Sequence, residues 1–317
     1  MNTAGLSMRS GFALIMVLFV LAMLSTFALN FVTAMREHSA IARNLKEETE
    51  SYYMAVSGYH EAVNSILSDN DMSVDFIDGD GHFWLDPKVQ PITGKKTNQS
   101  GEVTISITDE NAKLNINLAR TDQLRRLFDY AGFAPDAVNE IIDSILDWKD
   151  SDTEHHLSGA EDEYYEDLDE PYRAKNAFFD VPEELFLVKG LTRDVFSGSD
   201  GLQPVLPFIT TFSRGTININ SVSEEVMTLL GLSPVEIEAI LKQRNEVSGG
   251  FRFIPREFTK YGLNATFTNT FRIEVTARVN NESRYANVSA VVNRLKTPDG
   301  YKVQTIYWRE REKNIGS

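Results

Sequence analysis

The sequence predicts an α+β protein in which a long N-terminal helix packs on an antiparallel sheet and a large helical domain is inserted into that sheet. Three observations support this prediction. An uncharged apolar segment opens the chain and continues as an amphipathic helix. One strand pattern near residue 105 is separated from three more after residue 270 by a mostly helical stretch. That stretch contains a repeated helical motif.

The N-terminal segment is too long for a secretory signal. From Ser10 to Met35 the chain runs 26 residues without a charged side chain. A signal peptide has an apolar region of about 7 to 15 residues and a small-residue cleavage site, whereas a membrane-spanning helix needs about 20 residues. We see no convincing cleavage site of the small-x-small type behind the segment. We therefore expect a transmembrane helix over residues 12–35.

The helical pattern continues beyond the membrane segment. No proline interrupts the chain from Phe12 to Leu67, and apolar residues recur every three or four positions. Because the spacing drifts and covers few heptads, packing on a sheet is favoured over a coiled-coil stalk. The pattern predicts one continuous helix whose outer half packs on the chain's own sheet, through Tyr52, Val56, Tyr59 and Val63.

Strand signals flank the helical stretch. Residues 102–109 alternate polar and apolar side chains with period two, as a half-buried strand does. Three further strand patterns follow residue 270, and the short connections NNES and LKTPDGY separate them. We expect these strands to form one antiparallel sheet that the inserted domain interrupts.

Two segments of the inserted stretch repeat one another, and both resemble helix-hairpin-helix units. Each begins with an extended (L/I)-N-I-N, followed by a helix, a turn with Gly and Pro, and a second helix, over residues 111–150 and 214–258. Thr121 and Ser221 are expected to cap the first helices. Such units bind DNA phosphate in many proteins, but the first hairpin is acidic here. Packing modules are therefore favoured over nucleic-acid binding.

Composition narrows the function. The formal charge is −15 at pH 7, and residues 143–170 hold much of the excess. This excess of acidic residues argues against a nucleic-acid partner, because lysine and arginine side chains supply most of the affinity for nucleic-acid phosphates. The chain has no cysteine, so an unusual loop cannot be braced by a disulfide or a zinc-thiolate site. The five histidines fall in no recognisable catalytic pattern. His155 and His156 could be transition-metal ligands, but two adjacent histidines in an acidic loop are expected to be merely solvated. We expect that this protein is not an enzyme.

The residues between the repeats carry a specific resemblance. The runs DWKDSD, GAEDEYY, PYRAKN and EELFLVKGLT, together with the two N-I-N segments, resemble the K-type minor pseudopilins of bacterial type II secretion systems. The junction of Arg9, Ser10, Gly11 and Phe12 resembles the leader of prepilins and pseudopilins. In that family a peptidase cuts after the glycine and methylates the new first residue, here Phe12. Fibre-building members carry a Glu at the fifth mature position, where this chain has Met16.

The resemblance implies a function and partners. Its members have a pseudopilin domain with a helical insertion, and they assemble with I-type and J-type minor pseudopilins at the pseudopilus tip. It implies contact with the major pseudopilin and the prepilin peptidase, and with secreted substrate or the outer-membrane channel. It also implies a single pass through the bacterial inner membrane with most of the chain in the periplasm. The alternative is a minor pilin of a type IV pilus or DNA-uptake machine that serves as a nucleic-acid-binding or adhesive receptor.

The acidic loop at residues 143–170 is the candidate metal site. Its twelve carboxylates repel one another, yet Trp148, Tyr164, Tyr165 and Tyr172 are interleaved with them, which favours a folded loop. Oxygen ligands select a hard cation, most simply Ca²⁺, and members of the resembled family bind calcium in the helical domain. The expected ligands are Asp147, Asp150, Asp152, Glu161, Asp162 and Glu163.

These observations divide the chain into five parts. A leader (1–11) precedes the transmembrane helix (12–35), and the helix stem with the first part of the sheet domain follows (36–110). The inserted helical domain (111–263) then precedes the remaining strands (264–317).

Overall fold

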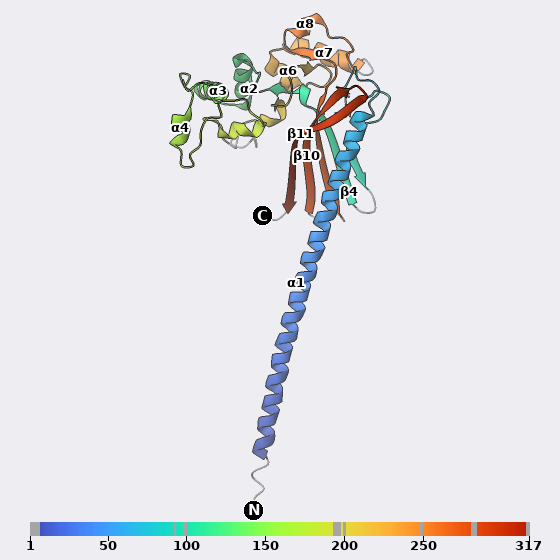
Figure 1. Cartoon of the computed structure of the whole chain (residues 1–317), viewed down its shortest axis with the longest axis vertical. Coiled ribbons are helices and arrows are strands. Elements are labelled where there is room, and N and C mark those ends of the chain that lie inside the picture. Colours follow the sequence, from blue (N-terminus) through green and yellow to red (C-terminus); the bar gives the residue numbers. More distant parts are fainter. Residues whose placement is uncertain are drawn as a thin grey trace, which may run out of the picture.

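A computed structural model describes residues 7–91, 93–97, 101–192, 198, 201–246, 250–279 and 284–314, and the side chains of residues 7–11, 284 and 311–314 are not described. The predicted hairpin turn NNES, residues 280–283, lies outside these described residues. The chain forms one long helix, α1, which extends from beneath a sheet, with shorter helices gathered at the opposite end of the sheet (Figure 1).

Helix α1 (Ser7–Leu67) is continuous for 61 residues, as the absence of proline predicts. Its first half, residues 12–35, is exposed along its whole length. Of the residues that the structure describes, those of α1 alone are long and apolar enough as a helix to cross a membrane. The second half contacts the sheet from residue 51 onward, where Ala55, Ala62 and Ile66 are completely buried.

The sheet has five antiparallel strands in the order β11-β10-β9-β4-β3. Their bounds are β3 (Gly94–Thr97), β4 (Gly101–Asp109), β9 (Thr270–Val279), β10 (Arg284–Thr297) and β11 (Gly300–Asn314). One face packs on α1 through the inward residues of each strand, such as Ile105, Ile273 and Val288. This confirms the predicted α+β arrangement of a long helix on an antiparallel sheet.

Neighbouring strands β4 and β9 are far apart in the sequence. They pair directly, with Asp109 opposite Phe271, so the chain between them leaves the sheet and returns to it. Before β3, the short strands β1 (Phe76–Ile77) and β2 (Phe83–Trp84) form a separate hairpin.

The excursion contains two helix pairs, each closed by a short parallel strand pair. The elements of the first unit are η1 (Glu110–Ala112), β5 (Leu114–Asn115), α2 (Thr121–Ala131), α3 (Pro135–Lys149), α4 (Asp162–Glu166), η2 (Pro182–Leu187), η3 (Leu206–Phe208) and β6 (Ile209–Thr210). Those of the second are β7 (Ile217–Asn218), α6 (Glu224–Leu230), α7 (Pro234–Glu246), α8 (Arg256–Thr259) and β8 (Leu263–Ala265). β5 pairs with β6, and β7 with β8.

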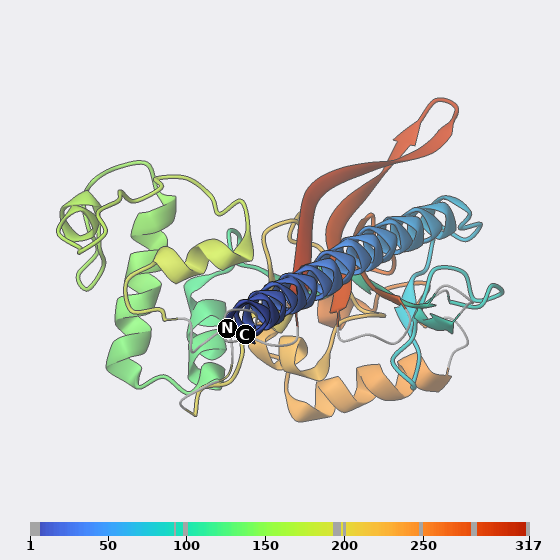
Figure 2. The same cartoon turned by 90° about the horizontal axis from the view of Figure 1, so that it is seen from below.

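Each unit has its own apolar core. One core surrounds α2 and α3, and another surrounds α6 and α7. In the view from below, α2 and α3 (green) lie on the left of the molecule, whereas α7 (orange) lies along its lower edge (Figure 2). Both pairs turn at a glycine in the left-handed conformation, Gly132 and Gly231.

The two predicted helix caps are wrong. Helix α2 begins one residue after Arg120, whose backbone N–H donates to the Gln123 side chain at 2.9 Å. Helix α6 is capped by Ser223, whose hydroxyl accepts from the Val226 N–H at 3.3 Å. Ser221 instead donates its hydroxyl to Asp109 at the end of β4, at 2.5 Å. A tertiary partner therefore takes the side chain that local sequence assigns to the cap.

Candidate metal centre and assembly surfaces

The acidic loop leaves the C-terminal end of α3 and folds back against it. Asp143 and Asp147 lie one turn apart on α3. Asp143 accepts from the Ser158 N–H at 3.0 Å, and Asp147 accepts from the His156 N–H at 3.0 Å. A methyl group on Gly159 would lie 1.8 Å from an Asp147 oxygen, so the loop backbone lies directly against this buried carboxylate.

Aromatic side chains support the loop from below. The Trp148 ring meets Tyr165 edge-on at 5.3 Å and stacks on Phe179 at 6.3 Å. Tyr165 is completely buried, whereas Tyr164 is exposed. The interleaved aromatic residues thus give a folded loop, because they connect it to the core of the first helix pair.

Two groups of side chains in this loop have the spacing of metal ligands. One contains Asp147, Asp150 and His156, and the other contains Asp150, Asp152 and Glu161; in each, one ligand atom per residue lies within 4.8 Å of the others. Ligands at 2.0–2.6 Å from a common ion lie at most about 5 Å apart. Each group therefore fits a single ion.

Unpaired acceptors support the fit. Both carboxylate oxygens of Glu161 and one of Asp150 are buried without a hydrogen-bond partner. Burial, with the nearby charges of Asp147 and Asp150, raises the pKa of Glu161 from 4.5 to about 7. A buried carboxylate without a partner is costly, and a bound cation removes that cost. The site would hold a divalent cation that supplies positive charge to these oxygens.

The nearby cationic side chains are directed elsewhere. Lys149 donates to the Ile116 carbonyl at 3.3 Å, and Lys189 donates to the carbonyls of Ser158 and Gly159 at 3.2 and 3.4 Å. Among the residues that the structure describes, neither lysine forms an ion pair with Asp150 or Glu161. The unpaired oxygens of these two carboxylates therefore stay available to a metal.

The structure gathers four of the six predicted ligands into these groups, Asp147, Asp150, Asp152 and Glu161. Asp162 instead accepts from the Ala174 N–H at 3.0 Å. Glu163 is exposed on α4 and joins neither group.

His156 was missed by the sequence analysis. Its ring nitrogen Nδ1 contacts an Asp147 oxygen, so the expectation that it is merely solvated is wrong. Its neighbour His155 is exposed and bonds only to the His156 carbonyl among the contacts described, at 2.9 Å. No local pattern distinguishes the two histidines, because the chain must fold back onto α3 before either meets a carboxylate.

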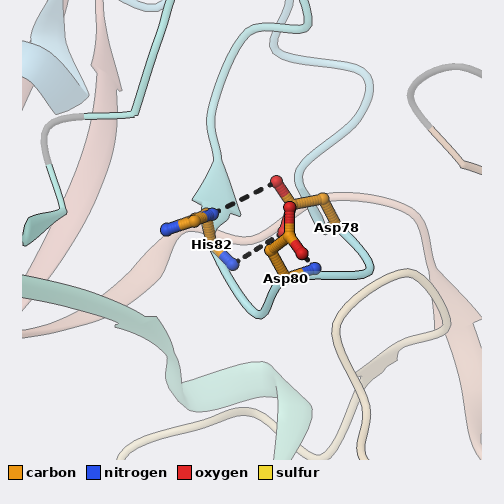
Figure 3. Close-up of side chains that lie close together, drawn as sticks. All are labelled: Asp78, Asp80 and His82. Carbon is orange, nitrogen blue, oxygen red and sulfur yellow. Dashed lines mark hydrogen bonds and ion pairs between the residues drawn. The ribbon is translucent and has the colours of Figure 1, made fainter.

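A third acidic group lies in the β1–β2 turn. Asp78, Asp80 and His82 approach one another there (Figure 3). Asp78 already accepts from the N–H groups of Asp80 and His82 at 3.0 and 2.8 Å and from the Trp84 indole at 2.7 Å. Asp80 and His82 are exposed. This turn therefore lacks the buried, unpaired oxygens of the loop after α3.

The predicted assembly residues of α1 mostly face the chain's own sheet. Tyr59 is buried, and its hydroxyl lies 2.7 Å from the Thr305 hydroxyl. Tyr52, Val56 and Val63 are partly buried against the same core. Met16 is 60% exposed within the apolar half of the helix. Gly11 belongs to α1 but its surroundings lie outside the described part, as do residues 1–6 of the predicted leader.

In the turn between α6 and α7, the backbone N–H of Ser233 is already bonded to the Glu236 carboxylate. Glu236 accepts from the Ser233 N–H at 2.8 Å and from the Ser233 hydroxyl at 2.7 Å, which is a capping box. These contacts and the Tyr261 hydroxyl lower the pKa of Glu236 to about 2. A phosphate approaching this turn would meet a permanent negative charge, which argues against nucleic-acid binding here.

Known proteins resemble this chain over most of its length. A family model described as type II secretion system (T2SS), protein K matches residues 104–209. Protein K of Pseudomonas aeruginosa is 27% identical over 270 residues, covering 80% of this chain and 77% of its own. Protein K of Pectobacterium carotovorum is 26% identical over 265 residues, covering 75% and 76%.

A solved structure has the same fold. A chain in the crystal structure of the GspK-GspI-GspJ complex from the enterotoxigenic Escherichia coli type 2 secretion system superposes with a TM-score of 0.64 at 17% identity. The superposition covers 86% of this chain and 99% of that chain.

A long apolar helix packed on an antiparallel sheet is the arrangement of a pilin-like structural subunit, and the matched family is one of non-enzymatic minor pseudopilins. The chain belongs to the type II secretion system protein K family.

Proposed function

We propose that this minor pseudopilin occupies the tip of the pseudopilus, where it initiates or caps fibre assembly during export across the outer membrane. The position of the inserted helices supports the proposal. The helices α6, α7 and α8 lie at the end of the sheet opposite the membrane half of α1, and α2, α3 and α4 project to the side of the sheet (Figure 1). A subunit stacking from that side would meet them before it reached the sheet, so the chain suits a terminal position.

The membrane helix supports the same position. In fibre-building relatives a Glu at the fifth mature position pairs with the N-terminal amine of the subunit above it. Met16 takes that place here and carries no charge. An unpaired carboxylate in lipid is expensive, so a topmost subunit is better without one.

The proposed partners are minor pseudopilins of the I and J types, which accompany GspK in the solved complex. The major pseudopilin would lie below them in the fibre, and the prepilin peptidase would process the leader. The helices at the top would be available to secreted substrate or to the outer-membrane channel. The proposed location is the bacterial inner membrane, crossed once by α1, with the rest of the chain in the periplasm.

We also propose that Asp150, Asp152 and Glu161 bind Ca²⁺. These residues supply only oxygen ligands, and Glu161 is buried with both oxygens unpaired. A hard cation prefers such ligands. The ion would hold the loop after α3 against the first helix pair.

Co-purification tests the tip assignment. The full chain, produced with I-type and J-type minor pseudopilins in detergent, is expected to form a stable complex of the three. A matched mixture with the major pseudopilin in place of the J-type protein serves as the control. Failure to associate, together with salt-sensitive binding of DNA by the purified chain, would favour the nucleic-acid receptor instead.

Thermal unfolding tests the calcium site. Because a ligand bound to the folded state raises stability by about 2.7 kcal/mol at a hundred times its Kd, calcium is expected to raise the melting temperature of the chelator-treated protein. Glu161→Gln should abolish this shift, whereas Glu163→Gln, which changes an exposed residue two positions away, should keep it. Equal melting of the unmodified chain with calcium and with chelator would refute the site.

A further inference from the structure

Residues 71–77, which lead from the end of α1 into β1, contact the second helix pair along their length. We call this segment the strap. Three contacts join it to the second helix pair and to the chain just after β8: the ion pair of Asp71 with Arg252 at 2.8 Å, the hydrogen bond from the Thr266 hydroxyl to the Ser73 carbonyl at 2.9 Å, and the one from the Ile77 N–H to the Asn220 carbonyl at 3.1 Å. The strap therefore connects α1 directly to the inserted domain.

Asp75 lies near the centre of the strap and is completely buried. Its N–H donates to the Thr266 carbonyl at 3.0 Å, and its carbonyl accepts from the Asn218 amide at 3.0 Å. One oxygen of its carboxylate accepts from the Thr268 N–H at 2.7 Å. Asn218 lies in β7, where the second helix pair begins, and Thr268 lies just before β9, where the chain rejoins the sheet. Asp75 thus holds both ends of the second helix pair.

The carboxylate of Asp75 has too little positive charge around it. The charged groups that face it are Arg294 of β10, Asp109 at the end of β4 and Asp69 after α1, and each is at most 7% exposed. Arg294 makes its closer ion pair with Asp69 and lies 3.6 Å from one Asp75 oxygen. The other Asp75 oxygen has no hydrogen-bond partner among the residues that the structure describes. Because one guanidinium cannot balance three buried carboxylates, an ionised Asp75 destabilises the contacts around it.

We propose that the strap is a pH-sensitive switch: it stays closed on the second helix pair while Asp75 is neutral, and ionisation of Asp75 favours its release. Release would free α6, α7 and α8, which lie at the end of the sheet away from the membrane half of α1 (Figure 1). The switch acts within the chain and does not depend on the position of the chain in the fibre.

The direction of the switch follows from proton linkage. In the closed strap, burial raises the pKa of Asp75 well above 3.8, and the charge of Asp109 adds to this effect. In the open strap the carboxylate reaches water and regains the ordinary pKa of an aspartate. Opening therefore becomes easier as pH rises from about 4 to the closed-state pKa, and it is independent of pH above that value.

Amide hydrogen exchange of the full chain in detergent, followed by mass spectrometry, tests the switch. Exchange is measured between pH 5 and pH 8 and corrected for the intrinsic exchange rate at each pH. In peptides that contain residues 71–77 and 263–268, the protection factor should fall by about tenfold per pH unit up to the closed-state pKa. Peptides from the centres of β9 and β10 should keep their protection, because the strap opens without unfolding the sheet.

Two variants assign the effect to Asp75. Asp75→Asn keeps an acceptor for the Thr268 N–H and cannot ionise, so its strap should stay protected at pH 8. Asp80→Asn changes an exposed carboxylate five positions away and should keep the pH-dependent opening. Circular dichroism confirms that each variant is folded, and the pH profile of the unmodified chain is a test that needs no variant. Protection of the strap that does not change with pH, an equal loss of protection throughout the sheet, or the same pH dependence in Asp75→Asn as in the unmodified chain would overturn the proposal.

Discussion

The side chain of Asn220 pairs with the backbone of Phe251 in both directions. The amide donates to the Phe251 carbonyl at 2.8 Å and accepts from the Phe251 N–H at 2.6 Å. It also donates to the Thr266 carbonyl at 3.1 Å. Asn220 is completely buried, so this one side chain connects the start of the second helix pair with the segment that closes it.

The first helix pair repeats this arrangement. Asn117 donates to the Phe179 carbonyl at 2.9 Å and accepts from the Phe179 N–H at 2.8 Å. Asn117 and Asn220 occupy the same place in the two N-I-N segments. In each repeat the asparagine therefore holds a later segment of the chain against the start of its helix pair. Asparagine suits this position because its side chain presents a hydrogen-bond donor and an acceptor together.

Replacing Asn220 by Asp should destabilise the protein. Two donated bonds would become contacts between a carboxylate and carbonyl oxygens, at a cost of about 1–3 kcal/mol or more. Chemical denaturation of the full chain in detergent measures the change. Asn245→Asp, on the exposed side of α7, is the control and should have little effect. Similar losses in both variants would contradict the role assigned to Asn220.

Replacing Gly159 by Ala should disturb the proposed calcium site. The added methyl group would lie 1.8 Å from an Asp147 oxygen, so either the carboxylate or the loop must move. We expect cation affinity to fall by about tenfold or more, as for other residues that orient ligands. Gly79→Ala, where the methyl would meet nothing within 4 Å, provides the control. Calorimetry measures the calcium affinity of each variant. An unchanged affinity in Gly159→Ala would contradict the role of the close contact between Gly159 and Asp147.

Asp75 is a second buried carboxylate that lacks a full set of partners. One of its oxygens accepts from the Thr268 N–H at 2.7 Å and lies 3.6 Å from an Arg294 nitrogen, while the other has no partner. Arg294 makes its closer ion pair with Asp69. Burial holds the pKa of Asp75 well above its usual 3.8, and the charge of Asp109 adds to this effect.

This pKa predicts a pH dependence of stability. Because the folded state binds the Asp75 proton more tightly than the unfolded state, the contribution is present below about pH 3.8 and is lost as pH rises toward the folded pKa. Asp75→Asn keeps an acceptor for Thr268 and removes the charge. We expect the variant to gain stability relative to the unmodified chain, and to gain more at pH 8 than at pH 5. Equal differences by denaturation at the two pH values would refute this.

Replacing Met16 by Glu should impair secretion. At the fibre tip the new carboxylate would have no amine above it to pair with and would remain buried in lipid. Secretion assays and localisation of the variant along the fibre measure the effect, with Met16→Leu as a control of similar volume. Normal secretion by Met16→Glu, with the variant found in the fibre shaft, would show that the chain is not confined to the tip.

Cleavage is expected between Gly11 and Phe12. The mature chain would then begin with Phe12 and would lose Arg9, which changes the formal charge from −15 to −16. Intact-mass analysis of protein extracted from membranes shows the new terminus and its methyl group. Gly11→Val should block processing, and recovery of the unprocessed chain from cells that contain the peptidase would refute the prediction.

Elements with a local pattern could be predicted from the amino-acid sequence. The uncharged run to Met35 and the apolar stripe that follows it specify α1, since a helix repeats its faces every three to four residues. Alternation with period two specifies β4 and the three strands after residue 270. The candidate ligands Asp147, Asp150, Asp152 and Glu161 could also be named in advance, because the run of carboxylates and its interleaved aromatic residues are visible in the local sequence.

Contacts between side chains far apart in the sequence could not be predicted from it. Ser221 bonds to Asp109 rather than capping a helix, and the ring of His156 contacts the buried Asp147 whereas that of its neighbour His155 contacts the His156 carbonyl. The parallel pairings of β5 with β6 and of β7 with β8 join segments that have almost no strand signal of their own. These contacts depend on where the chain returns after an excursion, and periodicity carries no information about that return.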